Sequence, residues 1–183
     1  MLAPLGKLDS IVELVSQDTV AELLGLASGT PLGGCFVEVG VYQGGTARQL
    51  HELAMHQQRL LYLYDTFAGI PFADLDKGDA HIVGDFADTS YEAVQALCPF
   101  ALITAGVFPG SAVPMPPVAF AHLDCDQYRS VRDSLAYLGP LMASGGIIWL
   151  DDSPCLGGAH AAAQEVYGDR LELSRSIKHY IRF

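Results

Sequence analysis

The sequence predicts an α/β protein whose mostly parallel central sheet has helices on both faces. Short, almost wholly apolar runs alternate with segments of helical periodicity, and strands buried on both faces of a parallel sheet have this composition. Carboxylates directly follow several of these runs. Because the carboxyl ends of parallel strands lie at one edge of an open sheet, where ligands bind, the sequence also indicates a site with acidic side chains.

The expected elements follow one another along a single domain, residues 1–183. Residues 8–26 predict a helix within an N-terminal segment, 1–30, ahead of a Rossmann-like core at 35–183. Five apolar runs predict its strands: CFVEV (35–39), LLYLYD (60–65), FALITAG (100–106), PVAFAHLD (117–124) and ASGGIIWLDD (143–152). Helices are predicted at 46–56, 90–98, 130–142 and 159–168, a loop or lid at 66–89, and a terminal pair of strands at 170–183.

The composition excludes several classes of protein. Half of the residues are hydrophobic and 17% are charged, which is typical of a globular domain. No apolar run approaches the roughly 20 residues that span a bilayer, and the N-terminus lacks the apolar region of a signal peptide. We therefore expect a cytoplasmic protein without membrane association. A formal net charge of −11 argues against nucleic-acid binding, and four scattered cysteines indicate neither a disulfide framework nor a zinc site.

Acidic side chains gather where the predicted strands end. Asp65 closes one apolar run, Asp124 and Asp126 follow another, and Asp151 and Asp152 close a third. A single aspartate after a strand often caps the next helix, and this alternative stays open for each of them. Their shared position at one edge of the sheet favours a ligand site.

A glycine-rich turn separates the first predicted strand from its helix in VEVGVYQGGTA, residues 37–47. Glycines allow a tight turn and close approach of a ligand, and the helix N-terminus offers unpaired N–H groups. Glu38 lies within the strand before the turn, where a buried carboxylate needs a cationic or donor partner. Asp65 ends the next strand, where such folds place the acid that binds ribose hydroxyls. A ligand with an amine and a ribose, such as S-adenosylmethionine, suits this pair.

Five motifs together resemble the macrocin O-methyltransferase family over about residues 35–167. They are VEVGVYQGGTA, YDTFAGIP, AGVFPGS, HLDCDQYRSVRDSL and GGIIWLDDSP, in this order. The resemblance implies a class I methyltransferase fold and magnesium-dependent transfer of a methyl group from S-adenosylmethionine to sugar hydroxyls of natural products. The chain departs from the family at Tyr42-Gln43, where Trp-Arg is usual, and in the segment after Asp152, which lacks the usual tyrosine and basic residue. These departures fall where an acceptor would be bound.

The resemblance also implies roles for individual residues. Asp124, Asp151 and Asp152 would bind Mg²⁺ or Mn²⁺, and Asp126 would be the general base. The expected partner is a small hydroxyl acceptor that contains a sugar, and a homodimer is left open. The residues expected to bind S-adenosylmethionine are Glu38, Gly40, Tyr42, Gly44, Gly45, Thr46, Asp65, Gly106, Phe108 and Asp124.

This set of residues suits the chemistry. An aliphatic hydroxyl is a poor nucleophile until it loses its proton, and a hard cation held by carboxylates lowers the pKa of that hydroxyl. Asp126 would stay ionised in the field of the cation and remove the proton. If the backbone stays extended through residues 124–126, the side chains of Asp124 and Asp126 project to the same side.

Two other functions compete with this interpretation. In a nucleotide-sugar glycosyltransferase, LDCD would bind manganese and a diphosphate, but the glycine-rich turn and Asp65 would then have no role. A non-enzymatic module could keep the S-adenosylmethionine pocket and lack acceptor binding. Among the remaining candidates, His122 and Trp149 are expected in the core, Tyr128 in packing or loop support, and His160 near the acceptor or at the surface.

Overall fold

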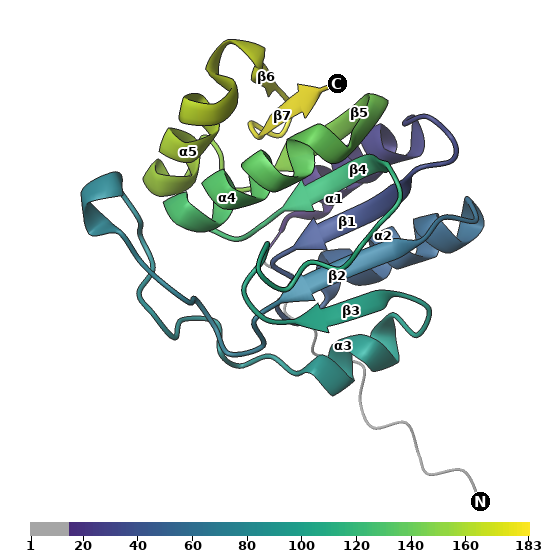
Figure 1. Cartoon of the computed structure of the whole chain (residues 1–183), viewed down its shortest axis with the longest axis horizontal. Helices are drawn as coiled ribbons and strands as arrows, with labels where there is room; N and C mark the ends of the chain where they lie inside the picture. Colours follow the sequence, from purple (N-terminus) through teal and green to yellow (C-terminus); the bar gives the residue numbers. More distant parts are fainter. Residues whose placement is uncertain (1–14) are drawn as a thin grey trace, which may run out of the picture.

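A seven-stranded sheet with the strand order β3-β2-β1-β4-β5-β7-β6 forms the centre of the protein (Figure 1). The computed structural model describes residues 15–183. The strands β1 to β5 are parallel, whereas β7 is antiparallel to both β5 and β6, which confirms the predicted sheet and its terminal pair. The strands are β1 (Cys35–Val39), β2 (Leu61–Asp65), β3 (Leu102–Ala105), β4 (Val118–Leu123), β5 (Met142–Leu150), β6 (Glu172–Leu173) and β7 (His179–Arg182).

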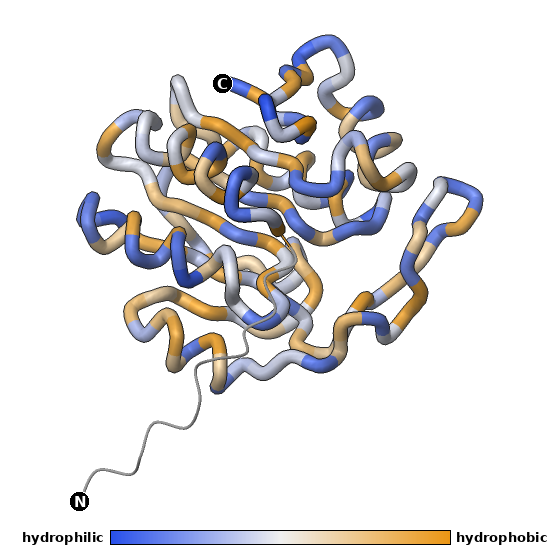
Figure 2. The backbone as a smooth tube through the Cα atoms, turned by 180° about the vertical axis from the view of Figure 1, so that it is seen from behind, coloured by the Kyte–Doolittle hydropathy of each residue, from blue (hydrophilic) through white to orange (hydrophobic). Residues whose placement is uncertain are grey.

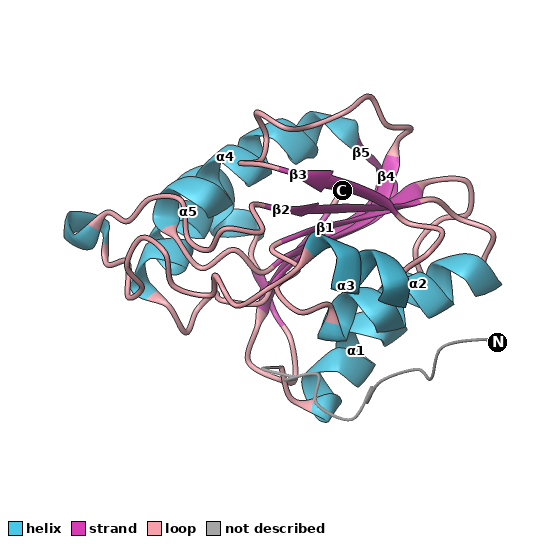
Figure 3. Cartoon of the chain, turned by 90° about the horizontal axis from the view of Figure 1, so that it is seen from below, coloured by secondary structure: helices cyan, strands magenta, loops and turns pink. Residues whose placement is uncertain are grey.

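Helices cover both faces of the sheet (Figure 3). One face carries α1 (Gln17–Ser28), α2 (Gly45–His56) and α3 (Tyr91–Leu97), and the other carries α4 (Tyr128–Leu138) and α5 (Gly157–Tyr167). Three short 3₁₀ helices connect other elements: η1 (Leu75–Lys77), η2 (Gly139–Leu141) and η3 (Gly168–Arg170). The arrangement is the α/β fold with a mostly parallel sheet that the sequence predicts, and it agrees with the fold that the resemblance implies.

Successive side chains of a central strand point to opposite faces of the sheet and pack in two separate hydrophobic cores. In β1, Val37 and Val39 pack on the side of α4 and α5, whereas Phe36 packs on the side of α1 and α2. Trp149 of β5 is fully buried on the second side, as expected. Both faces of a central strand are thus covered, which explains why these runs are apolar throughout and why hydrophobic colouring runs through the middle of Figure 2.

Helices α1 and α4 begin at other residues than predicted, and α5 begins at Gly157, two residues before its predicted start. The first helix begins at Gln17, because the Ser16 side chain accepts a hydrogen bond from the Thr19 N–H and caps it. The predicted start at residue 8 lies outside the described residues, as does the rest of 1–14. Helix α4 begins at Tyr128, two residues earlier than predicted, and gives way to η2 at Gly139.

The chain order along the sheet reverses between β1 and β4, and the ends of these two strands touch. Gly40 follows β1 with φ of +86°, and a Cβ at this position would lie 1.8 Å from the Asp124 carbonyl oxygen. Only glycine fits both the backbone conformation and the space. Open α/β sheets have their ligand-binding crevice where the strand order reverses in this way.

The predicted lid, residues 66–89, crosses from β2 toward the N-terminal ends of α4 and α5 (Figure 1). Apart from η1 it contains no helix or strand. Two contacts fix it on the helices: the Gly158 N–H donates to the Gly78 carbonyl at 3.0 Å, and the Tyr128 N–H donates to Asp79 Oδ1 at 2.7 Å. The lid therefore lies beside the ends of β4 and β5.

The β6–β7 hairpin brings the C-terminal part of the chain to the same edge. Leu150 of β5 pairs with His179 of β7, so Lys178 lies beside Asp151. The turn is fixed to α1 because Glu22 accepts hydrogen bonds from the Arg175 and Ser176 N–H groups, each at 2.8 Å. Within residues 15–183, no helix is long and apolar enough to cross a membrane.

Candidate active site

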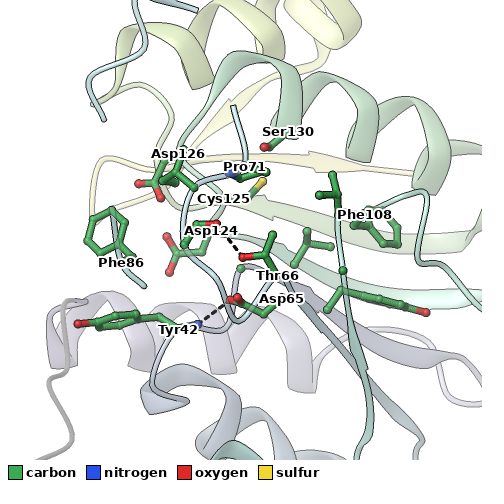
Figure 4. Close-up of a pocket in the computed structure, with 17 residues that line it drawn as sticks. Tyr42, Asp65, Thr66, Pro71, Phe86, Phe108, Asp124, Cys125, Asp126 and Ser130 are labelled. Atoms are coloured by element: carbon green, nitrogen blue, oxygen red, sulfur yellow. Dashed lines mark hydrogen bonds between the residues drawn. The ribbon is translucent and has the colours of Figure 1, made fainter. Parts of the chain in front are cut away.

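A cleft of about 760 Å³, including the space at its open mouth, lies at the carboxyl ends of β1, β2 and β4. Asp124 and Asp126 lie on the Phe86 side of the cleft, Phe108 lies on the opposite side, and Asp65 lies between them (Figure 4). The lining residues are Val39, Gly40, Tyr42, Tyr64, Asp65, Thr66, Gly69, Ile70, Pro71, Phe86, Gly106, Val107, Phe108, Asp124, Cys125, Asp126 and Ser130.

Asp65 organises the glycine-rich turn. Its Oδ2 accepts the N–H groups of Val41 at 2.7 Å and Tyr42 at 2.9 Å, and its Oδ1 accepts the Phe67 N–H at 2.7 Å. Each carboxylate oxygen can accept further bonds, so Asp65 can hold the turn and still bind a ligand in the cleft. The Tyr42 hydroxyl donates to Asp88 Oδ2 at 2.9 Å, which joins the turn to the end of the lid.

The predicted cofactor residues divide into two groups. Six of them line the cleft: Gly40, Tyr42, Asp65, Gly106, Phe108 and Asp124. The wall of the cleft does not include Gly44, Gly45 and Thr46, which lie at the start of α2, or Glu38.

Glu38 is buried in β1, and its Oε1 lies 2.9 Å from His122 Nδ1 of β4. Burial of the carboxylate raises the pKa of Glu38, although the hydrogen bond and charge of His122 oppose this shift. The sequence correctly indicated that this carboxylate needs a partner and that His122 is a hydrogen-bonded core residue. The partner in the structure is His122, whereas we expected the amine of the cofactor.

The three predicted metal ligands come together at the edge of the sheet. One carboxylate oxygen from each of Asp124, Asp151 and Asp152 can be chosen so that all three lie within 4.8 Å of one another. Asp124 follows β4, and the other two follow β5, whose ends are adjacent because these strands pair in parallel. Carboxylate oxygens at such spacing are suitable ligands for a hard divalent cation.

Asp126 lies beside this cluster, but its backbone differs from the prediction. Strand β4 ends at Leu123, and Asp126 has φ of +59°, so the expected extended geometry through residues 124–126 is wrong. The Asp126 N–H donates to Asp152 Oδ2 at 2.8 Å, which compensates for the left-handed conformation. The side chain nevertheless lines the cleft, and its Oδ1 lies 3.6 Å from Nε2 of His81 in the lid.

Asp126 does not cap helix α4. The N-cap residue of α4 is Gln127, whose side chain makes no capping bond, and the Tyr128 N–H donates to Asp79 of the lid. The capping role that the sequence left open for Asp126 is therefore filled by a residue 49 positions away from Tyr128.

Comparison with known proteins identifies the chain. Residues 18–179 match the sequence profile of the macrocin-O-methyltransferase family (TylF). The chain belongs to this family. It is thus an S-adenosylmethionine-dependent O-methyltransferase, which rules out the glycosyltransferase alternative.

Solved structures share the fold of this macrocin-O-methyltransferase family member. The O-methyltransferase NovP has a TM-score of 0.76 and 22% sequence identity, over 90% of this chain and 78% of NovP. The calicheamicin methyltransferase CalS11 has a TM-score of 0.72 and 21% identity, over 90% of this chain and 77% of CalS11. No curated protein sequence matches the chain.

Burial and mutual repulsion raise the pKa of carboxyl groups in the acidic cluster of this family member. Burial, followed by the charge of Asp152, raises the pKa of Asp124 well above its ordinary value. Burial and the neighbouring Asp126 raise the pKa of Asp152 to about 7, and burial and Asp151 raise that of Asp126 to about 6. Carboxylates held close together in a buried site repel one another, and a cation among them removes this cost. The donor set therefore fits a divalent metal ion.

Sequence reasoning missed three residues that shape the site. Lys178 Nζ lies 2.9 Å from Asp151 Oδ2, Asp79 fixes the lid, and His81 faces Asp126. Lys178 could have been found from the predicted terminal strands. A strand that pairs antiparallel with 143–152 begins next to the end of that strand, so the residue just before it lies beside Asp151. For Asp79 and His81, the irregular sequence of the lid carried no periodic signal.

Neither of the remaining candidates, Tyr128 and His160, lines the cleft. The Tyr128 ring is buried and its hydroxyl donates to Glu165, which supports the packing role. His160 Nδ1 lies 3.2 Å from the Ser153 hydroxyl, and its ring stacks on His179. Of the four cysteines, Cys35 and Cys98 are buried and Cys155 is exposed; none forms a disulfide.

Proposed function

We propose that this O-methyltransferase requires a divalent metal ion and methylates a sugar hydroxyl of a small molecule. The observation that carries the proposal is the cluster of Asp124, Asp151 and Asp152, in which one oxygen from each residue lies within 4.8 Å of the others. Within this cluster Asp124 lines the cleft, as does the neighbouring Asp126. A cluster built only for stability would not gather buried carboxylates that repel one another.

The two sides of the cleft would bind different ligands, the cofactor on one side and the metal ion on the other. S-Adenosylmethionine would lie over the Gly40–Tyr42 turn, with its ribose at Asp65 and its adenine against Phe108. Phe108 packs against Tyr64 with ring centroids 4.7 Å apart, which makes an apolar wall for a flat ring. On the other side, Asp124, Asp151 and Asp152 would hold Mg²⁺ or Mn²⁺.

The chemistry requires an activated hydroxyl. A divalent cation, when bound, supplies positive charge that lowers the pKa of an acceptor hydroxyl next to it. Asp126 accepts the proton of that hydroxyl. The acceptor oxygen then forms a bond to the methyl carbon, the bond from this carbon to sulfur breaks, and S-adenosylhomocysteine leaves. The ends of β1 and β4 would align the two reacting groups, because these strands pair in parallel along their length.

The proposed acceptor class is supported by the structural neighbours. CalS11 is described as a TDP-rhamnose 3′-O-methyltransferase. A sugar attached to a nucleotide or to a natural product is therefore the first class of acceptor to test on this chain. The exposed apolar side chains of the lid, Leu75, Ile82 and Val83, suit an acceptor with an apolar part beyond its sugar.

Metal removal tests the proposal directly. The enzyme, dialysed against EDTA, is expected to form no S-adenosylhomocysteine with a panel of nucleotide sugars and glycosides, and added Mg²⁺ or Mn²⁺ should restore product formation. The control is S-adenosylhomocysteine binding by calorimetry, which should persist in EDTA because Asp65 and the turn hold it. Full turnover in EDTA would overturn the metal requirement. Cofactor binding without turnover on any acceptor of the panel would overturn the proposed acceptor class.

Replacing Asp65 with Ala tests the proposed binding site for S-adenosylmethionine. We expect S-adenosylhomocysteine affinity to fall by roughly 10- to 100-fold, because charge-assisted hydrogen bonds to a ribose are lost. Asp65 also holds the turn, so calorimetry should be repeated with 2′-deoxy-S-adenosylhomocysteine. A smaller loss with the deoxy ligand indicates direct contact with the ribose, and an equal loss with both ligands indicates an effect through the turn alone. Asp88→Ala, which removes the exposed carboxylate that accepts from Tyr42, is the matched control and should change affinity little.

A further inference from the structure

Lys178 brings a positive charge to the carboxylate cluster. Its Nζ lies 2.9 Å from Asp151 Oδ2 and also donates to the Asp151 carbonyl oxygen. The Lys178 side chain is 18% exposed and that of Asp151 is 8% exposed. Taking an ammonium group this far out of water is unfavourable unless a charged partner compensates, so the contact differs from an ordinary surface ion pair.

The fold holds Lys178 in place by several independent contacts. The His179 N–H donates to the Ser153 carbonyl at 2.7 Å, which continues the pairing of β7 past the end of β5. On the other side, the Ser174 N–H donates to the Lys178 carbonyl at 2.8 Å, and the Lys178 N–H donates to the Ser174 hydroxyl at 3.0 Å. The backbone on both sides of Lys178 is thus fixed next to Asp151.

We propose that Lys178 is a positioning residue that orients Asp151 and, through its positive charge, weakens the affinity of the cluster for a divalent cation. This inference rests on the metal site proposed above. It concerns a residue that neither carries the chemistry nor lines the cleft.

The charges of the site support this inference. When the three aspartates of the cluster are ionised, as ligands of a cation, they and the Lys178 ammonium group carry a formal charge of two minus, and Asp126 beside them adds a further negative charge. Without Lys178 the same cluster would carry three minus and attract the cation more strongly, since charges interact strongly at short distance in a poorly solvated site. His122 Nε2 is 4.0 Å from Asp151 Oδ1, but His122 is paired with Glu38, so it does not replace Lys178 as a compensating charge.

The second carboxylate oxygen of Asp151, Oδ1, also accepts a hydrogen bond. Trp149 Nε1 donates to Asp151 Oδ1 at 3.3 Å, while Lys178 occupies Oδ2. The carboxylate is therefore oriented before any cation arrives. A preoriented ligand loses less conformational freedom on binding, so Lys178 affects the metal site in two opposite ways, of which the charge effect is the larger.

The test is Mn²⁺ affinity, measured by calorimetry on the full chain. Lys178→Met, which keeps the length of the side chain without its charge, is expected to bind Mn²⁺ about 10-fold more tightly than the wild type or better. The melting temperature of the metal-free variant should fall, and Mn²⁺ should raise it by more than in the wild type. Lys178→Arg should stay close to the wild type in both measurements. The matched control is Arg182→Met, in the strand β7 that directly follows Lys178 and paired with Glu172, which should leave Mn²⁺ affinity unchanged.

The results separate this inference from the metal requirement itself. Unchanged or weaker Mn²⁺ binding by Lys178→Met would overturn the inference, as would tighter binding by Arg182→Met. If Lys178→Met does not fold, Lys178→Gln gives the same test, because its amide can donate to Asp151 without a charge. If the wild type binds no Mn²⁺ but the variant does, the metal requirement fails and the role of Lys178 stands. If neither binds, both fail, and S-adenosylhomocysteine affinity shows whether the cofactor site is intact.

Discussion

Replacing Asp126 with Asn is expected to lower turnover by about 10²- to 10⁴-fold, which is the usual contribution of a general base. The change removes the proton-accepting oxygen but keeps the size of the side chain. The Asp126 backbone N–H that donates to Asp152 is unaffected, so the cluster should keep its shape. Single-turnover assays with a competent acceptor at saturating Mn²⁺ measure the loss. Calorimetry should show unchanged S-adenosylhomocysteine affinity and retained Mn²⁺ binding, weakened because one negative charge beside the cluster is lost.

Asp85→Asn is the matched control for this experiment. Asp85 Oδ2 lies 3.7 Å from Nδ1 of His81, the residue whose Nε2 faces Asp126, but Asp85 does not line the cleft. Its loss should leave turnover within a few-fold of the wild type. Near-wild-type turnover of Asp126→Asn would remove the base assignment while leaving the metal site in place. A large loss in both variants would instead indicate that the lid, rather than the Asp126 carboxylate, limits the reaction.

The fold was predictable from the sequence because its strongest features are local. A strand such as 118–123, which is buried along its whole length, needs apolar side chains on both faces, and this pattern is visible without knowing its neighbours. The helix boundaries were less predictable. The start of α4 at Tyr128 depends on Asp79, which lies 49 residues away and completes the helix N-terminus from the lid.

Which residues form the site was easier to predict from the sequence than how these residues are arranged. The end of a parallel strand is set by the strand itself, so Asp124, Asp151 and Asp152 could be placed together from sequence. The backbone turn at Asp126 could not, because its left-handed conformation is compensated by a hydrogen bond to Asp152, 26 residues away. The partner of Glu38 is 84 residues away, and burial alone could not distinguish His122 from a bound amine.

Replacing Asp124 with Asn is expected to have two opposite effects. Mn²⁺ affinity should fall by roughly 100-fold or more and methyl transfer should fall with it, because one of three anionic ligands is lost. The metal-free protein, in contrast, should melt a few degrees higher than the wild type, since a neutral amide does not repel the neighbouring carboxylates. Calorimetry and thermal melting in EDTA measure the two effects separately.

The opposite signs follow from the surroundings of Asp124. Burial and then the charges of Asp152 and Asp151 raise the pKa of this carboxyl group, so its ionised form lowers the stability of the folded, metal-free protein near neutral pH. Functional sites commonly retain such costs, because the same charges bind the ligand. Asp133→Asn is the control: Asp133 lies 2.7 Å from Arg132 and 3.6 Å from Arg129, so neutralising it should change Mn²⁺ affinity little and should not raise the melting temperature. If Asp124→Asn melted below the wild type without metal and bound Mn²⁺ equally well, Asp124 would be a structural residue, and the metal site would need other ligands.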